Sequence, residues 1–164
     1  MLMSDPLDIL LAHDRWATGQ ILSACETLTP EQFHRRFDIG PGSLHDAATH
    51  ILAAMRIWGD LLAGREERPR LEGTTRTLAE LRKLLDEIAA DLAISARAHP
   101  LDQTVSRIRE GKIHTYTRGA VLAHVTTHGM HHRAQCLNML RHLGVKPLPP
   151  VSVAEWTRLV DSGA

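Results

Sequence analysis

The sequence has few aromatic residues, no net charge and no long hydrophobic run. Aromatic side chains make up 4% of the 164 residues, and the 19 lysine and arginine residues balance the 19 acidic ones. A balanced charge argues against the broad basic face that a phosphate backbone requires, so we expect no nucleic-acid partner. No apolar stretch approaches the roughly 18 residues that span a bilayer, so we expect no membrane insertion.

Cysteine is also scarce in this chain. Its two cysteines, Cys25 and Cys136, lie far apart, which suits a reducing cytoplasm better than a disulfide framework. The first residues carry no basic segment followed by an apolar run, so we expect no signal peptide and a cytoplasmic location. The length and a hydrophobic content of 43% are typical of one globular domain over residues 1–164.

Apolar residues recur at helical spacing along most of the chain. Capping residues, prolines and glycines divide this pattern into four long helices. Their expected ranges run from about Pro6 to Leu28, from Ser43 to Ala63, from Thr77 to His99 and from Thr117 to Leu143. Residues 103–116 predict a short β-hairpin or an extended excursion, and residues 153–160 predict a short last helix. The pattern as a whole predicts an all-α fold, an antiparallel four-helix bundle with an apolar core.

Histidine, in contrast, is abundant, with 11 residues in the chain. Four of them fall in the run His124-Val-Thr-Thr-His128-Gly-Met-His131-His132. His128 and His132 are four residues apart, so on a helix their imidazoles stand on one face and can bind a transition metal together. Helical geometry places His132 inside the apolar arc of this helix and His128 at its edge. The other histidines of the helix point further round, toward solvent or a neighbouring helix: His124, His131 and His142.

The helix expected over residues 43–63 offers a third ligand. Its apolar arc contains His50, whereas His45 falls on the polar side with Thr49. Burying an unpaired imidazole is energetically costly, and coordination of a metal ion would offset that cost for His50. A site of three imidazoles with open positions fits zinc or nickel. The predicted metal ligands are His50, His128 and His132.

Other interpretations of these residues stay open. Cys136, one turn after His132, would close the site if it were a fourth soft ligand. A buried free cysteine more often packs as a small hydrophobe, which is also our interpretation of Cys25. The histidines could instead form a hydrogen-bonded network that holds no ion at all.

Two longer segments and one short one carry a likeness to a known family. The most specific is His124-Val-Thr-Thr-His128-Gly-Met-His131-His132-Arg133-Ala134-Gln135, and the second surrounds His50 and extends from Ser43 to Trp58. A weaker piece is His13-Asp14-Arg15-Trp16-Ala17. With these segments the chain resembles, over nearly its whole length, the DinB / YfiT-like family of metal-binding four-helix bundles. Ala134 departs from the glycine common in that family, whereas His50, His128 and His132 match its ligand positions.

The resemblance implies an up-down-down-up bundle that is often a homodimer. Relatives include thiol-dependent S-transferases and a mycothiol-dependent maleylpyruvate isomerase, which implies a small-molecule substrate and a low-molecular-weight thiol as partner. An ion with an open position lowers the pKa of a thiol or water that binds it. We therefore expect a metal-dependent enzyme that acts by thiol transfer or by hydrolysis. The alternative is a non-catalytic metal-binding protein: a sensor, a store, or a bundle whose ion only staples the helices.

No general acid or base stands out in the sequence. Four side chains could each reach a site at the end of the bundle: His13, Asp14, His124 and His131. Of these, Asp14 has the pattern of a solvated helix residue. Arg133 could bind a substrate carboxylate or lie on the surface, and Gln135 could orient a ligand or bond to a neighbour. Trp16 and Trp58 could line a pocket, although core packing is the default for tryptophan.

Overall fold

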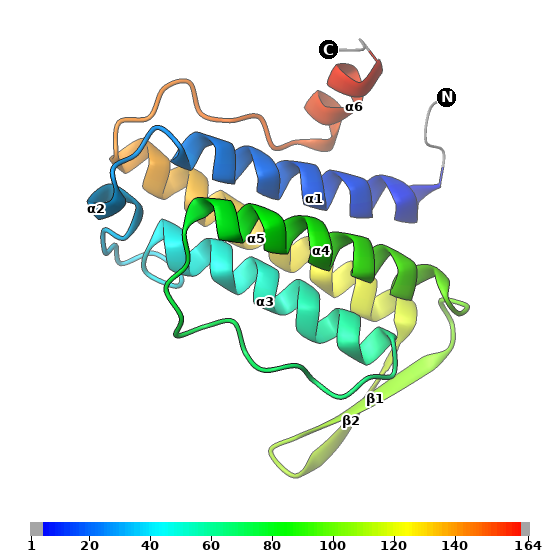
Figure 1. Ribbon diagram of the computed structural model, residues 1–164. Helices are drawn as coiled ribbons and strands as arrows, with labels where there is room; N and C mark the ends of the chain where they lie inside the picture. Colours follow the sequence, from blue (N-terminus) through cyan, green and yellow to red (C-terminus); the bar gives the residue numbers. More distant parts are fainter. Residues whose placement is uncertain (1–4, 162–164) are drawn as a thin grey trace.

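The computed structural model describes residues 5–161 of the chain and is mostly helical, with one small sheet (Figure 1). Its elements are α1 (Pro6–Cys25), α2 (Pro30–Phe33), α3 (Leu44–Leu62), α4 (Leu78–Arg97), β1 (Thr104–Arg109), β2 (Lys112–Thr117), α5 (Arg118–His142) and α6 (Val153–Asp161). The predicted helical fold with a hairpin before the last long helix is confirmed. One domain over residues 1–164 stays a prediction, and residues 1–4 and 162–164 lie outside the described part.

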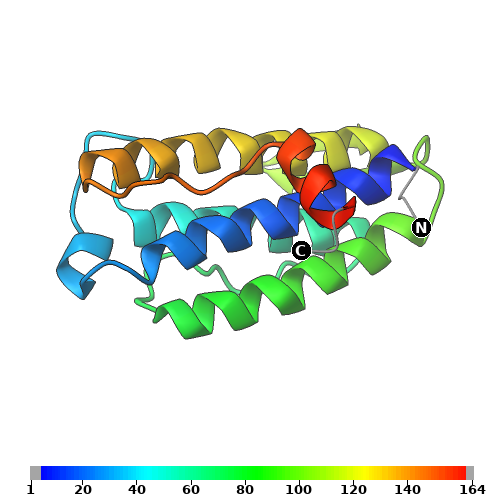
Figure 2. The ribbon, with the colours of Figure 1, turned by 90° about the horizontal axis from the view of Figure 1, so that it is seen from above.

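The four long helices lie side by side (Figures 1 and 2). Helix α3 packs against α4 and α5, and α1 packs against the same two helices from the other side. In Figure 1, α1 and α5 run from right to left, whereas α3 and α4 run from left to right. Apolar side chains from all four helices fill the space between them, among them Ile21, Leu52, Leu81 and Leu140. No helix within residues 5–161 has both the length and the apolar character needed to cross a bilayer.

Side-chain caps begin three of these helices where the sequence indicates. Ser43 caps α3, Thr117 caps α5, and Thr77 and Glu80 form a reciprocal capping box at the start of α4. Each cap supplies an acceptor for a backbone N–H group that the first helical turn leaves without an intrahelical partner. The predicted starts of these helices are therefore confirmed.

The first helix ends earlier than predicted. It stops at Cys25 rather than near Leu28, and residues 30–33 form the separate helix α2, which the sequence analysis did not predict. Thr29 Oγ1 accepts a hydrogen bond from the backbone N–H of Gln32, and Oε1 of Gln32 accepts one from the backbone N–H of Thr29. Proline at the first helical position loses no hydrogen bond, so Pro30 is well suited to start this new helix.

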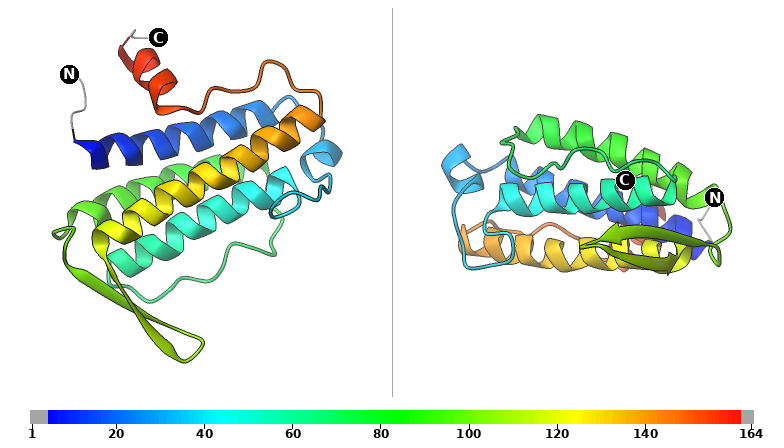
Figure 3. Two further views of the ribbon diagram at one scale, coloured as in Figure 1. Left: turned by 180° about the vertical axis from the view of Figure 1, so that it is seen from behind. Right: turned by 90° about the horizontal axis from the view of Figure 1, so that it is seen from below.

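The two strands form an antiparallel hairpin that projects away from the helices (Figure 3). Glu110 and Gly111 have φ values of 51° and 74° and make its tight turn. Two-residue turns with positive φ match the right-handed twist of the strands that they join. The turn places Ile108 directly opposite Ile113, and both side chains are 73% exposed.

Candidate metal centre

Three imidazole rings converge between helices α3 and α5. The ring centroids of His50 and His128 are 5.0 Å apart, those of His50 and His132 are 4.6 Å apart, and those of His128 and His132 are 4.4 Å apart. One ring nitrogen from each residue lies within 4.8 Å of the other two. Within residues 5–161, no other group of three His, Cys, Asp or Glu side chains has this geometry. The structure thus brings together the three histidines that the sequence singled out.

Helix packing explains the convergence. His128 and His132 are one turn apart on α5, and the face that carries them lies against α3, which carries His50. His132 is 9% exposed, and the other two histidines are partly buried. The three rings therefore share a half-buried position between two packed helices.

Burial keeps two of the rings neutral. Desolvation, together with the neighbouring imidazoles of His132 and His50, lowers the pKa of His128 to about 4. Burial also lowers the pKa of His132, although a hydrogen bond to Gln135 opposes this shift. Neutral imidazole is the form that binds a metal ion. His128 Nδ1 is buried without a hydrogen-bond partner in the described structure, so the site contains a polar atom that a cation could satisfy.

Two side chains outside the triad orient its rings. His132 Nδ1 donates to Oε1 of Gln135 over 2.8 Å, and Gln135 Nε2 in turn donates to Nε2 of His131 over 3.0 Å. His50 Nδ1 lies 3.3 Å from Oε1 of Glu72 and donates to it. In a neutral ring the other nitrogen is then an acceptor, so both His132 and His50 leave Nε2 free for an ion. Three imidazole nitrogens placed in this way could hold a metal ion.

The DinB family model matches residues 3–156, which is nearly the whole chain. This chain belongs to the DinB family. The match covers both helices that carry the triad and the loop that carries Glu72. A search of curated proteins finds no match.

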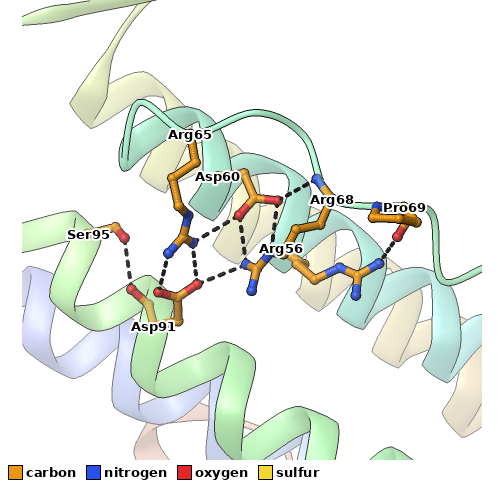
Figure 4. Close-up of polar contacts among 7 residues, drawn as sticks. All are labelled: Arg56, Asp60, Arg65, Arg68, Pro69, Asp91 and Ser95. Carbon is orange, nitrogen blue, oxygen red and sulfur yellow. Dashed lines mark hydrogen bonds and ion pairs between the residues drawn. The ribbon is translucent and has the colours of Figure 1, made fainter.

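A network of ion pairs holds the α3–α4 loop of this DinB chain in place (Figure 4). Glu72 lies in the same loop. Asp60, buried near the end of α3, accepts from Arg65 Nη2 over 2.9 Å and from the backbone N–H and Nε of Arg68, each over 3.1 Å. Both arginines also pair with Asp91 of α4. Burial raises the pKa of the Asp60 carboxyl, but the hydrogen bonds from Arg68 and Arg65 outweigh this effect and lower it overall. The network therefore anchors the α3–α4 loop to both helices.

Glu72 is a residue that the sequence analysis missed. It lies 22 positions from His50, in a loop rich in charged residues. A glutamate in such a loop resembles any solvated surface residue, and no local spacing relates it to the histidine. Only the path of the anchored loop brings the two together.

Asp14 and Arg133 do not belong to the triad, and the interpretation of Asp14 as a solvated residue is wrong. Arg133 Nη1 donates to Asp14 Oδ1 over 2.5 Å and to Thr18 Oγ1 over 3.2 Å. Asp14 is 1% exposed and Arg133 is 2% exposed, so this is an ion pair in the core between α1 and α5. Arg133 is therefore not a surface residue, and it already holds a carboxylate of its own chain. His13 lies beside this pair, where its Nε2 bonds to the carbonyl oxygen of Val151 over 2.9 Å.

The face of α3 that carries His45 and Thr49 was predicted to be polar, but both side chains are buried. Their angular position on the helix therefore gave the wrong expectation. His45 is 5% exposed and Thr49 is 2% exposed. The backbone N–H of Arg76 donates to Nε2 of His45, and the His45 ring lies against Phe33 of α2. The angular position of a residue predicts burial only against the other long helices. Here α2 and the α3–α4 loop cover a second face of α3.

The remaining candidates lie around the triad or apart from it. His124 and His131 are exposed, and the His124 ring is 5.5 Å from that of His128. Trp58 packs edge-on against His124 and Tyr116, with centroid distances of 5.0 and 5.5 Å. Half-buried Trp16 lies 6.1 Å from the His13 ring. Cys25 and Cys136 are buried and lie outside the group of ligand atoms, and burial raises the pKa of the Cys136 thiol to about 12.

Proposed function

We propose that this protein binds a divalent transition metal ion, zinc or nickel, through His50, His128 and His132, and that it is an enzyme acting on a small molecule by thiol transfer. The observation that carries the proposal is the convergence of three imidazole nitrogens within 4.8 Å of one another. Such an ion would supply positive charge that lowers the pKa of a thiol or water in its open position. Hydrolysis is the other reaction that this chemistry allows.

Two further side chains support this role, because they orient the rings of His132 and His50 for metal binding. Gln135 fixes the tautomer of His132, and Glu72 fixes that of His50. Outer partners of this kind commonly change metal affinity by about 10–100-fold when they are removed. A ligand set made only of neutral imidazoles also leaves the full charge of an ion available to a substrate.

The metal site is tested by elemental analysis of purified variants. We expect His50→Ala, His128→Ala and His132→Ala each to reduce metal affinity by at least about tenfold, because each removes one ligand. The matched control is His142→Ala, an exposed histidine on the same helix. Equal occupancy in the control and in all three variants would refute the ligand assignment.

The reaction is tested by a screen of glutathione, mycothiol and bacillithiol against electrophiles, with and without added zinc or nickel. Thiol conjugation that requires both the ion and the triad would support the enzyme. Conjugation that is the same in wild type and in His128→Ala would overturn it.

A second candidate is a metal that only staples the bundle. One observation favours it: all three ligands come from α3 and α5, so an ion would link two neighbouring helices. Metal removal separates the two functions. A large fall in melting temperature without any effect on turnover would favour the staple, whereas lost turnover in a folded protein would favour the enzyme.

The wider expectations from the resemblance belong to the same proposal. We assign the four long helices to the up-down-down-up topology, which the helix directions in Figure 1 support. We also propose a cytoplasmic homodimer with no nucleic-acid partner. Sedimentation of the purified chain tests the dimer.

A further inference from the structure

A cavity of about 470 Å³ lies between the N-terminal half of α3 and the loop around Glu72. Its volume is within the range of cavities that bind small molecules. Of the three proposed ligands His50 alone is part of its wall, so a molecule in this cavity would contact the metal centre through His50. We call it the α3-loop cavity.

The wall of the α3-loop cavity contains two carboxylates, Asp46 and Glu72, and no lysine or arginine. Asp46 already pairs with Arg36 and with Nδ1 of His45. Glu72 differs, because within residues 5–161 it forms no ion pair with arginine or lysine. Its Oε1 accepts from His50, while its Oε2 is buried without a partner. One oxygen of this cavity-lining side chain thus has no hydrogen-bond partner in the described structure.

Thr49 supplies a second unpartnered polar atom in the same wall. It is 2% exposed, and its Oγ1 has no hydrogen-bond partner in the described structure. Other buried helical threonines here donate to the carbonyl oxygen one turn back, as Thr18 does to Asp14. A buried hydroxyl without a partner destabilises the fold, because it has lost its hydrogen bonds to water. The hydroxyl and the carboxylate oxygen belong to side chains that line one cavity, and neither has a hydrogen-bond partner in the described structure, which indicates a polar ligand.

We propose that the α3-loop cavity is the substrate pocket of the metal centre, and that Glu72 and Thr49 select a small molecule carrying an ammonium or similar N–H donor. A carboxylate at that end would instead face Glu72 and be repelled. The selection rests on the proposed function, because it requires an ion on the triad beside the cavity. The carboxylate of Glu72 also accepts a hydrogen bond from His50, so Glu72 would contact both the substrate and a metal ligand.

The test compares two thiols of similar length in the cobalt(II)-loaded protein. Cysteamine ends in an ammonium and 3-mercaptopropionate ends in a carboxylate, and each gives a sulfur-to-cobalt charge-transfer band that reports binding. We expect cysteamine to bind at least about tenfold more tightly, because its ammonium can form a charge-assisted hydrogen bond with Glu72.

Two variants locate the selection. Thr49→Val keeps the shape of the side chain and removes the hydroxyl, so we expect weaker cysteamine binding, by several-fold, with unchanged mercaptopropionate binding and unchanged metal affinity. Glu72→Gln keeps an acceptor for His50 and removes the charge, so we expect the preference for cysteamine to disappear. Glu66→Gln, an exposed glutamate of the same loop, is the matched control and should retain the preference.

The outcomes separate this inference from the proposed function. If the wild type takes up no cobalt, zinc or nickel, the metal centre fails and this selection fails with it. If metal and both thiols bind with equal affinity, the selection is wrong and the metal centre stands. A preference that persists unchanged in both Thr49→Val and Glu72→Gln would also overturn the assignment of the pocket.

Discussion

Gly129 on α5 makes room for the buried ion pair of Asp14 and Arg133. A Cβ atom at residue 129 would lie 2.5 Å from Asp14 Oδ1 and 2.8 Å from Arg133 Nη1, which is too close for either contact. The two charged side chains are 1% and 2% exposed, so neither can move into solvent without opening the core. We therefore expect Gly129→Ala to separate or distort the pair.

Two opposing effects decide the size of the change. Alanine is favoured over glycine inside a helix by about 1 kcal/mol, so helix propensity alone predicts a more stable variant. Breaking a buried ion pair costs about 3–5 kcal/mol, because an uncompensated charge stays in the core. The net expectation for Gly129→Ala is a loss of roughly 2–4 kcal/mol in the free energy of unfolding.

Urea unfolding followed by circular dichroism measures this loss. A chelator in all samples removes any contribution from metal at the neighbouring His128. The matched control is Gly19→Ala in α1, where the nearest atom to a new Cβ is Leu85 Cδ2 at 3.9 Å, an ordinary contact. We expect the control to gain up to about 1 kcal/mol. If Gly129→Ala is as stable as the control, the reasoning about the ion pair is refuted.

Three further predictions concern pH, ring orientation and the loop. The pKa of His128 is lowered from 6.5 to about 4 in the folded chain, so the unfolded chain binds a proton first as pH falls. The free energy of unfolding of the metal-free protein should therefore be fully retained above pH 6.5 and should decrease as the pH falls from 6.5 to 4. Urea titrations at several pH values should show a smaller decrease in His128→Ala. Gln135→Ala removes the acceptor of His132 Nδ1 and should weaken metal binding by about 10–100-fold in a chelator competition; an affinity equal to that of the control Asn138→Ala would contradict this. Asp60→Ala should destabilise the protein by about 1–3 kcal/mol, because it removes charged hydrogen bonds whose arginine partners can still reach water. It should also increase proteolysis within residues 65–73, and an unchanged cleavage pattern there would argue against the anchoring role of the network.

The long helices could be predicted from the sequence because their signals are local. Ser43, Thr77 and Thr117 start α3, α4 and α5 where the pattern indicates, since a cap acts on the turn that follows it. The spacing of His128 and His132 likewise fixes their common face before any tertiary contact forms. His50 was singled out because it lies in an apolar arc, and the structure brings it to the pair.

The short elements and the loop could not be predicted in this way. Helical periodicity gives the angle of a side chain around its own axis, but not what covers that angle. His45 and Thr49 are buried because α2 and the α3–α4 loop cover their side of α3. Asp14 and Arg133 have the pattern of surface residues until the packing of α1 on α5 joins them.

The sequence by itself determined the helices, the paired histidines and the candidate third ligand. Only the tertiary structure decided which nitrogen of His50 is free, because Glu72 reaches the ring through a loop that Asp60 anchors. The physical reason is the range of the interactions. Caps and helical faces depend on residues within one or two turns, whereas the tautomer and burial of a site residue depend on side chains that are distant in the chain.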